Sequence, residues 1–280
     1  MKVIGIDPAP AKDTVIYDGE KFIEIPAIEL KKYLEIFKED TLICWDSPLT
    51  GGLPTNFDQG EKEYNPFSQR KIEQLINEKV KQPNNKKVKG ISTLPYAGCS
   101  HWAITQHCFG LPLINDEFAS KTPIPFKLIT SHSEREKLSS KENYIVEVHP
   151  ALAVLLWLME EKEKLDNDKW DYKKNKEIFN ILVKQLLTKI KKSPAIIEPK
   201  DDGDGKYKVK VTVIKNKVEK NSEKIMKDDH LDAYIAWQLG TLWLEKENEV
   251  LLVGNHDTGL MLLPNDASGI GKKWQETLKE

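Results

Sequence analysis

The sequence predicts an α/β protein whose mixed sheet has three antiparallel strands plus parallel strands, with helices on both faces. Three observations lead to this prediction. Short apolar runs near the N-terminus have the length of strands. The pair Asp18-Gly19 separates two of these runs, which is typical of a β-hairpin. A segment with helical spacing of apolar residues then precedes the next run, as in a strand–helix–strand crossover.

The first five elements follow one another closely. Residues 2–7 (KVIGID) are expected to form a buried strand, and residues 14–18 and 21–25 a hairpin. Residues 27–39 carry apolar side chains at helical spacing, and residues 41–46 (TLICWD) have the composition of a fourth strand. Because a right-handed crossover joins parallel strands, we expect the fourth strand to lie in a mixed sheet with an antiparallel edge.

The later elements are more varied. A loop rich in Gly, Pro and Asn occupies residues 47–67, and loops of this length are usually functional. Residues 207–214 alternate strictly, so we expect a strand that pairs with residues 195–198. Further helices are expected at 68–81, 100–109, 151–164, 172–191 and 229–245, and further strands at 144–148, 250–254 and 259–263. We expect a single domain, 1–280, with helical and hairpin insertions at about 47–110 and 195–227.

The composition is that of a soluble globular chain, with 39% hydrophobic and 31% charged residues among 280. The formal net charge of -2 excludes a whole-chain basic excess, although residues 79–89 and 206–227 are locally rich in lysine. We find no membrane-length apolar segment, no secretion signal and too few cysteines for a disulfide framework. We therefore expect a cytoplasmic protein with no membrane partner, and the oligomeric state is left open.

Several acidic residues stand where a carboxylate is costly. Asp7 and Asp46 each end an apolar strand, and Glu147 interrupts the apolar run 144–148. A buried ionised carboxylate costs several kcal/mol, on the order of the penalty for any unpaired charge, unless something compensates it. A bound cation would supply that compensation.

A second group of acids lies on the predicted helix 229–245 and its start. Asp229 and Asp232 stand three residues apart, and Asp228 and Asp232 four apart, so both pairs share one helix face. The same face continues through Ala236 and Leu239, which makes it the packed face. Like charges at these spacings repel each other, so a cation is again the natural remedy.

Some of these acids also have a structural explanation. Asp7 and Asp46 could each begin a turn, and Asp228 or Asp229 could cap the helix. No such explanation fits Asp232 or Glu147. Hard oxygen ligands favour Mg²⁺ or Mn²⁺, and two such ions can activate water for attack on a phosphodiester.

Four segments resemble a known family: GIDPA at 5–9, CWDSPLTG at 44–51, EVHPALA at 147–153 and DDHLDAYIA at 228–236. They look like the domain family of unknown function numbered 429, described as predicted nucleases of ribonuclease-H fold. The pair Asp229 and Asp232 also resembles the last helix of RuvC-type resolvases. The resemblance implies a ribonuclease-H-like fold, with Asp7, Asp46, Asp229 and Asp232 as metal ligands.

Other candidates have two interpretations each. His149 could shuttle a proton or bond to a loop backbone, and His230 is interpreted as structural because it points away from the neighbouring acids. Lys206, Lys208 and Lys210 share one strand face, where they could contact phosphates or protect a sheet edge. Arg70 could clamp a phosphate or lie on the surface.

The sequence therefore predicts a Mg²⁺- or Mn²⁺-dependent nuclease that hydrolyses phosphodiester bonds in DNA or RNA. The predicted catalytic residues are Asp7, Asp46, Glu147, Asp229 and Asp232, with Glu147 as a further ligand or a general base. One alternative is a non-catalytic nucleic-acid or metal-binding module of the same fold. Another is an enzyme of the actin and sugar-kinase class, which should carry a second domain and glycine-rich phosphate loops.

Overall fold

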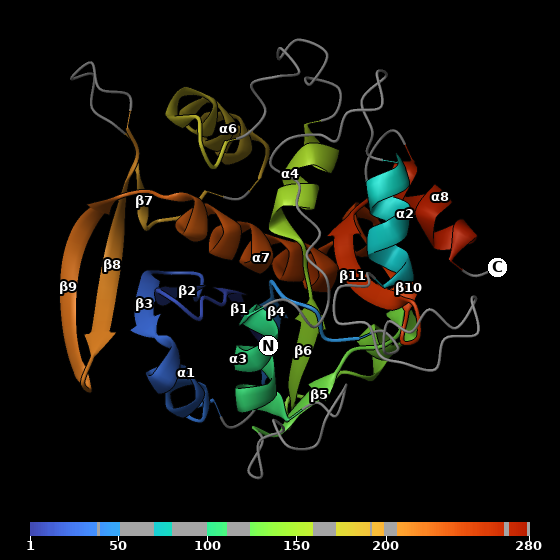
Figure 1. The fold of residues 1–280 in the computed structure, drawn as a ribbon, viewed down its shortest axis with the longest axis horizontal. Helices are drawn as coiled ribbons and strands as arrows, with labels where there is room; N and C mark the ends of the chain where they lie inside the picture. The colour runs from blue at the N-terminus through green and yellow to red at the C-terminus, as the bar shows by residue number, and fades with distance from the viewer. Residues whose placement is uncertain are drawn as a thin grey trace.

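The computed structural model contains one large sheet with helices on both of its faces, and a separate hairpin beside it (Figure 1). Its order is β5-β6-β4-β1-β2-β3-β8-β7, with β9 paired to β8. The structure describes residues 1–37, 40–50, 70–79, 100–110, 124–158, 172–190, 192–198, 206–265 and 269–278. Within these ranges the protein is an α/β protein with a mixed sheet, as the sequence predicts.

The centre of the sheet confirms the predicted strands. β1 (Lys2–Asp7), β2 (Asp13–Tyr17) and β3 (Phe22–Pro26) are antiparallel neighbours. β4 (Thr41–Trp45) lies on the other side of β1 and is parallel to it. β6 (Asn143–Glu147) is parallel to β4, and the short strand β5 (Phe126–Leu128), which was not predicted, is parallel to β6.

The helix between β3 and β4 is shorter than predicted. α1 (Ala27–Leu34) ends five residues before the expected boundary at residue 39, and residues 38–39 lie outside the described part of the chain. Leu30 and Leu34 are buried, whereas Ile28 and Ile36 are exposed. The apolar spacing therefore overstated the helix, because only two of its apolar positions face the sheet.

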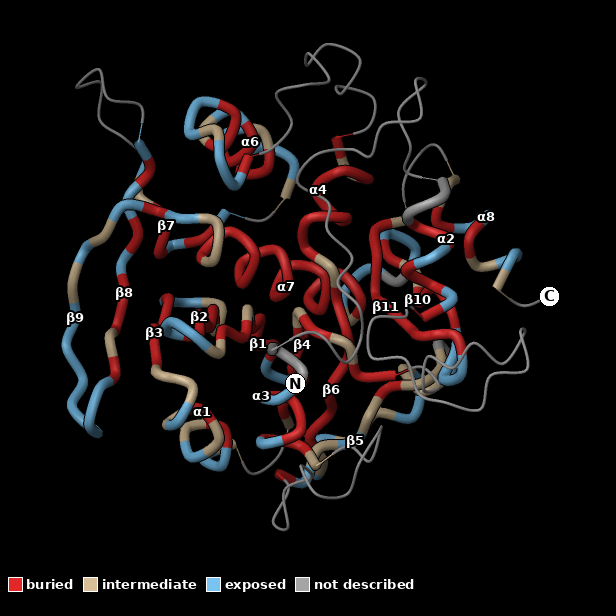
Figure 2. Tube along the Cα trace, viewed as in Figure 1, coloured by how far each residue is buried: buried red, intermediate tan, exposed pale blue. Residues whose placement is uncertain are grey.

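Alternation along the central strands creates two apolar layers. Val3, Leu42 and Cys44 belong to a cluster beneath α7 (Asp228–Glu245), while Ile4 and Ile43 belong to the opposite cluster. The opposite cluster contains α1 and α3 (Ser100–Phe109). α7 crosses the sheet at the centre of the molecule and is buried from His230 to Trp243 (Figure 2).

Two glycines allow α7 to lie directly on the sheet. A Cβ on Gly5 of β1 would come within 2.0 Å of the Ala233 carbonyl oxygen and 2.3 Å of the Trp237 nitrogen. A Cβ on Gly240 of α7 would lie 2.3 Å from the Cys44 sulfur of β4. The N-terminal end of α7 is consequently fixed against the ends of β1 and β4.

The lysine-rich region near the C-terminal third extends the main sheet. β7 (Ile196–Ile197) pairs antiparallel with β8 (Lys208–Lys215), as predicted, and β8 also pairs in parallel with β3. The unpredicted β9 (Val218–Ile225) forms the other partner of β8. Because β8 has partners on both sides, edge protection by Lys208 and Lys210 is a wrong interpretation.

The remaining elements surround this sheet. β10 (Val250–Asn255) and β11 (Gly259–Pro264) form the predicted closing hairpin, against which α2 and α8 pack. The other helices are α2 (Lys71–Lys79), α4 (Pro150–Trp157), α6 (Lys176–Lys189), α8 (Ile270–Thr277) and the 3-10 helices η2 (His132–Lys137) and η4 (Glu247–Glu249).

α6 begins four residues later than the predicted helix 172–191. The Asn175 side chain caps it by accepting hydrogen bonds from the backbone nitrogens of Glu177 and Ile178, at 3.1 and 3.3 Å. Residues 172–174 form a turn instead. This turn carries Tyr172 and Lys173 toward the N-terminus of α7. The predicted loop 47–67 and the second half of the predicted helix 151–164 lie mostly or wholly outside the described residues.

Candidate functional site

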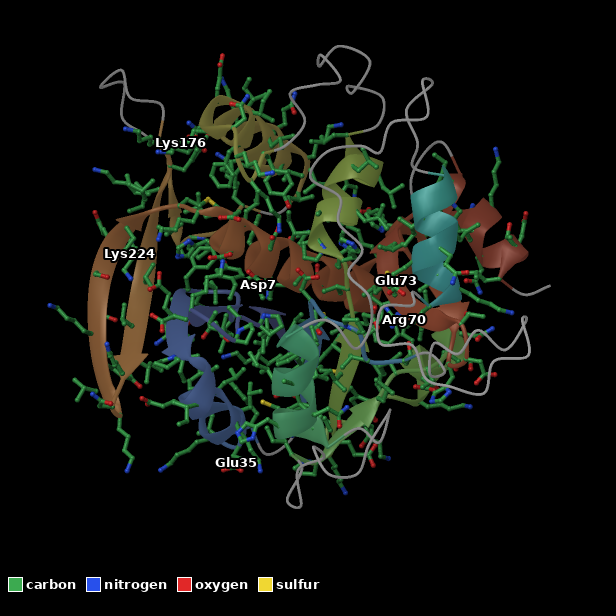
Figure 3. All side chains as sticks on the ribbon, viewed as in Figure 1. Asp7, Glu35, Arg70, Glu73, Lys176 and Lys224 are labelled. Carbon is green, nitrogen blue, oxygen red and sulfur yellow. The ribbon has the colours of Figure 1, made fainter. Side chains whose placement is uncertain are left out.

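Two of the predicted acids lie side by side at the carboxyl ends of parallel strands. Ile6 of β1 is the register partner of Trp45 of β4, so Asp7 and Asp46 come next to each other on these strands. Strand alternation places Asp7 on the same face as Val3 and Gly5, and Asp46 on the same face as Cys44. That face is the one covered by α7. Asp7 accordingly lies beneath α7 near the middle of the molecule (Figure 3).

The first turns of α7 bring two more acids to this point. Asp232 is only 1% exposed, and Asp229 is partly buried. The contact between Gly5 and the backbone around Ala233 sets how close this end of the helix comes to β1. We call the four side chains Asp7, Asp46, Asp229 and Asp232 the acidic cluster.

The electrostatics of the acidic cluster confirm that its members lie near one another. Burial raises the pKa of Asp7 well above its ordinary value, and the charges of Asp232, Asp46 and Asp229 raise it further. Burial likewise raises the pKa of Asp46, with a further contribution from Asp232. Mutual repulsion in a buried place is therefore a property of this site.

Two lysines and a tyrosine partly compensate the cluster. Lys173 Nζ lies 2.9 Å from Asp232 Oδ2, and the Tyr172 hydroxyl donates to Asp232 Oδ1 at 2.9 Å. Lys12 forms an ion pair with Asp229. The pKa of Lys173 is raised, chiefly by the charge of Asp232 and also by Asp46 and Asp7. These cations are therefore attracted to the group as a whole.

Asp7 and Asp46 are the members of the cluster that form no ion pair, although the charge of Lys173 lowers the pKa of both. Within the described residues, neither side chain has an ion pair or a hydrogen-bonding side-chain partner. Also within that part of the chain, no three His, Cys, Asp or Glu side chains are already arranged to hold a metal ion. Binding of a cation by all four acids would thus require Lys12 and Lys173 to give up their present carboxylate contacts.

Glu147 is placed differently from the other predicted site residues. It is the register partner of Trp45, so alternation turns it toward the face that holds Trp45 and Ile145, away from Asp46. Glu147 is 3% exposed, and its carboxylate accepts a hydrogen bond from the backbone N–H of Leu49 at 2.7 Å. The structure therefore does not bring Glu147 into the acidic cluster, although its charge contributes to raising the pKa of Asp46.

The partner of Glu147 is Arg70, which is 3% exposed. Arg70 Nη1 donates to Glu147 Oε2 at 2.8 Å, Nη2 contacts the other carboxylate oxygen, and the guanidinium also pairs with Glu73 (Figure 3). Arg70 Nη1 further donates to the Thr50 carbonyl oxygen at 2.6 Å. Arg70 is thus neither a surface residue nor a phosphate clamp, because two glutamates and a backbone carbonyl occupy it.

The histidines have separate structural positions. His230 Nδ1 accepts the backbone N–H of Lys227 at 3.1 Å, which leaves Nε2 to donate to Glu24 Oε1 at 3.1 Å. The structural interpretation of His230 is confirmed. β6 ends at Glu147, and His149 precedes α4 as its N-cap residue. The strand therefore does not continue to His149, and its role in proton transfer stays a prediction.

The sequence did not single out four residues that define this region: Lys12, Tyr172, Lys173 and Glu73. Lys173 and Tyr172 contact Asp232 across 59 and 60 residues, and Lys12 contacts Asp229 across 217. Local spacing carries no signal for such contacts. Glu73 has a local signal, because it stands in the first turn of α2, three residues after Arg70, which directly precedes that helix.

Comparison with protein-family models, curated proteins and solved structures finds no match for this chain. A separate search of the described helices finds none that is long and apolar enough to cross a membrane. The interpretation of the site therefore depends on its geometry and electrostatics.

Proposed function

We propose that this chain is a metal-dependent nuclease of ribonuclease-H-like fold that hydrolyses phosphodiester bonds in nucleic acid. The observation that carries the proposal is the convergence of four aspartates, two of which, Asp7 and Asp46, form no ion pair among the described residues. The sheet order β3-β2-β1-β4-β6, antiparallel in its first part and parallel in its second, supports the fold assignment.

The donor set suits a hard divalent cation. All four members of the cluster offer carboxylate oxygens, which are the ligands that Mg²⁺ and Mn²⁺ prefer. Burial and repulsion make the ionised cluster unfavourable by itself, and a cation would relieve both. Asp7, Asp46, Asp229 and Asp232 would hold the metal. When bound, such ions supply an activated water and charge stabilisation for a leaving oxygen.

The protein groups around the cluster have positioning roles in this proposal. Asp7 and Asp46 are fixed by the register of β1 and β4, and Asp232 by the packing of α7 on Gly5. Tyr172 holds one oxygen of Asp232 and so limits its rotation. Lys173, released from Asp232 by a cation, would be available to a phosphate oxygen of the substrate.

One alternative is favoured by a specific observation. The ion pairs Lys12–Asp229 and Lys173–Asp232 neutralise half of the cluster without any metal. That arrangement fits a non-catalytic module of the same fold, which would bind nucleic acid without cleaving it. The two functions differ in turnover and are separated by one assay.

The assay incubates labelled single- and double-stranded DNA and RNA with the protein in Mg²⁺ or Mn²⁺. We expect cleavage of at least one polymer, and a loss of more than about 100-fold in Asp7→Asn, since outer-shell partners of metal ligands alone are worth about 10- to 100-fold. Asp257→Asn, in the exposed turn of the β10–β11 hairpin, is the matched control and should cleave normally. Absence of cleavage of all four polymers, with metal bound, would establish the module instead.

A further inference from the structure

A pocket of about 890 Å³ opens between α6, the β7–β9 strands and the N-terminus of α7. Five lysines line it: Lys173, Lys176, Lys206, Lys208 and Lys227. Lys176, on α6, is separated in sequence from the lysines of the sheet but faces the same space (Figure 3). The chain as a whole has a net charge of -2, so this concentration of cations is local.

The acidic residues of the pocket do not cancel these cations. Three carboxylates, Glu198, Glu223 and Asp228, also line the pocket, against five lysines. Glu198 is paired at 2.8 Å with Lys192, which is not among the lining residues. Lys173 is likewise paired outside the lining, with Asp232 of the acidic cluster. Of the remaining lining residues four are lysines and two are carboxylates, so the lining keeps a positive surplus that suits a ligand with more than one negative charge.

The pocket adjoins the acidic cluster directly. Tyr172 and Lys173 line the pocket and contact Asp232 of the cluster. Asp228, the first residue of α7, also lines the pocket and stands next to Asp229. A polymer that lies in the pocket would consequently continue toward the four aspartates.

The pocket has the size and the apolar surface for a single strand. Its volume, about 890 Å³, is in the range of about 300–1,000 Å³ that holds small ligands, which suits a few nucleotides of one strand. Ile225, 47% exposed, and Ile197 supply apolar surface for bases beside the lysines. Sites that bind single strands combine a positive groove with side chains, commonly aromatic, on which bases stack, and here the two isoleucines would take that place.

We propose that this lysine-lined pocket binds the phosphate backbone of a single-stranded nucleic acid and guides it to the acidic cluster. The inference rests on the proposed function and adds the substrate class, a single strand rather than a duplex. It also assigns a role to lysines of the 206–227 region, since Lys208 lies on a strand that needs no edge protection.

The test measures binding without cleavage. A short fluorescein-labelled single-stranded oligonucleotide is titrated in EDTA, and its anisotropy is followed for the wild type and for the pair Lys176→Gln/Lys208→Gln. The matched control is Lys215→Gln/Lys220→Gln, which removes the same charge at the opposite end of β8 and β9, where seven residues at about 3.4 Å each separate Lys215 from Lys208.

We expect the slope of log affinity against log salt to be shallower by about 1.4 in the pocket variant, since each of the two lost phosphate contacts on a single strand contributes about 0.7 to its magnitude. Over the ten-fold range from 1 M down to 0.1 M salt, a slope change of about 1.4 amounts to roughly 25-fold. The pocket variant should therefore bind roughly 25-fold more weakly than the wild type at 0.1 M if the two bind equally at 1 M. The control variant should bind like the wild type. An unlabelled duplex should compete poorly.

Three results would overturn the inference: equal effects in the two lysine variants, full competition by duplex, or lysine-dependent binding of a mononucleotide triphosphate without binding of the oligonucleotide. The assay is independent of the nuclease proposal because it contains no metal. Normal strand binding by the pocket variant, with cleavage lost in Asp7→Asn, would remove only the inference. Weakened strand binding, with no cleavage by the wild type, would remove only the nuclease.

Discussion

Two groups of buried carboxylates lie near the ends of neighbouring parallel strands, one at β6 and the other at β1 and β4, and differ in what surrounds them. In the group around Glu147, Arg70 contacts both carboxylate oxygens and the backbone of Leu49 adds a hydrogen bond. In the acidic cluster, Asp7 and Asp46 have no such partners among the described residues, and burial followed by the charge of Asp232 raises the pKa of both. The first group links loop and helix to the sheet, and the second is the group that we propose binds a cation.

The comparison teaches that an acid in an apolar strand is not by itself a sign of metal binding. Glu147, Asp7 and Asp46 look alike in the sequence, because each follows an apolar run. They differ in the face of the sheet to which the side chain points, and in that Glu147 is paired with Arg70, which directly precedes α2, over 20 residues after β4.

Arg70→Met is expected to have the largest effect on stability. It would leave Glu147 and Glu73 buried without their cation, and removal of one partner of a buried pair costs about 3–5 kcal/mol. Urea unfolding at neutral pH measures the loss, and Arg70→Lys, which keeps the charge but not the two-pronged contact, should lose less. A loss below about 1 kcal/mol would show that the Arg70 group is not a structural clamp.

Gly5→Ala is expected to separate the two halves of the acidic cluster. The new Cβ would approach the Ala233 carbonyl oxygen to 2.0 Å, so α7 must shift, at a cost of about 1–3 kcal/mol. Thermal unfolding measures the cost, and Mn²⁺ affinity should fall with it because Asp232 moves away from Asp7. Gly269→Ala, where a Cβ meets nothing within 4 Å but φ is +69°, gives the cost of backbone strain alone.

Asp7→Asn is expected to stabilise the metal-free protein at neutral pH. The folded pKa of Asp7 lies above its ordinary value of 3.8, so its ionised form opposes folding, by about 1.4 kcal/mol for each pKa unit. The gain should disappear as the pH falls below about 3.8, where the aspartic acid is neutral in both states. Denaturation in EDTA across pH tests this, and a destabilised variant at pH 7 would contradict it.

Glu24→Gln is expected to show the opposite pH dependence with a smaller effect. Hydrogen bonding to His230, followed by contact with Lys224, lowers the pKa of Glu24 from 4.5 to about 2. Its stabilising contribution is therefore present above pH 4.5 and is lost as the pH falls toward 2. Wild type and variant should differ in Tm at neutral pH and converge in acid. A difference in Tm between wild type and variant that grows in acid would be inconsistent with a paired carboxylate.

Much of the fold could be predicted from the sequence, because local patterns determine it. The hairpin at Asp18-Gly19, the crossover helix and the strands ending at Asp7 and Asp46 follow from spacing and turn chemistry. β9 could not, since its residues are polar and mostly exposed, and its turn at Asn216 and Lys217 lacks a glycine despite positive φ at both. The helix predicted at 172–191 began too early, because Asn175 caps α6 and the helix starts only after it.

The four aspartates of the site could be predicted from the sequence. The cations that pair with them, and the exclusion of Glu147, could not. Asp7, Asp46, Asp229 and Asp232 are brought together as their strand ends and helix spacing indicated. The separation of Glu147 depends on a register that a single sequence does not give, since one residue of shift reverses the face. The contacts of Lys12 and Lys173 depend on chain segments far away in sequence.

Binding of divalent cations to the acidic cluster can be measured by titration with Mn²⁺ followed by electron paramagnetic resonance. We predict saturable binding of one or two ions to the wild type, about the number that such sites hold, strong weakening in Asp7→Asn and Asp46→Asn, and no change in Asp257→Asn. Binding that is absent from the wild type at millimolar Mn²⁺, or unchanged in Asp7→Asn, would contradict the proposed metal site.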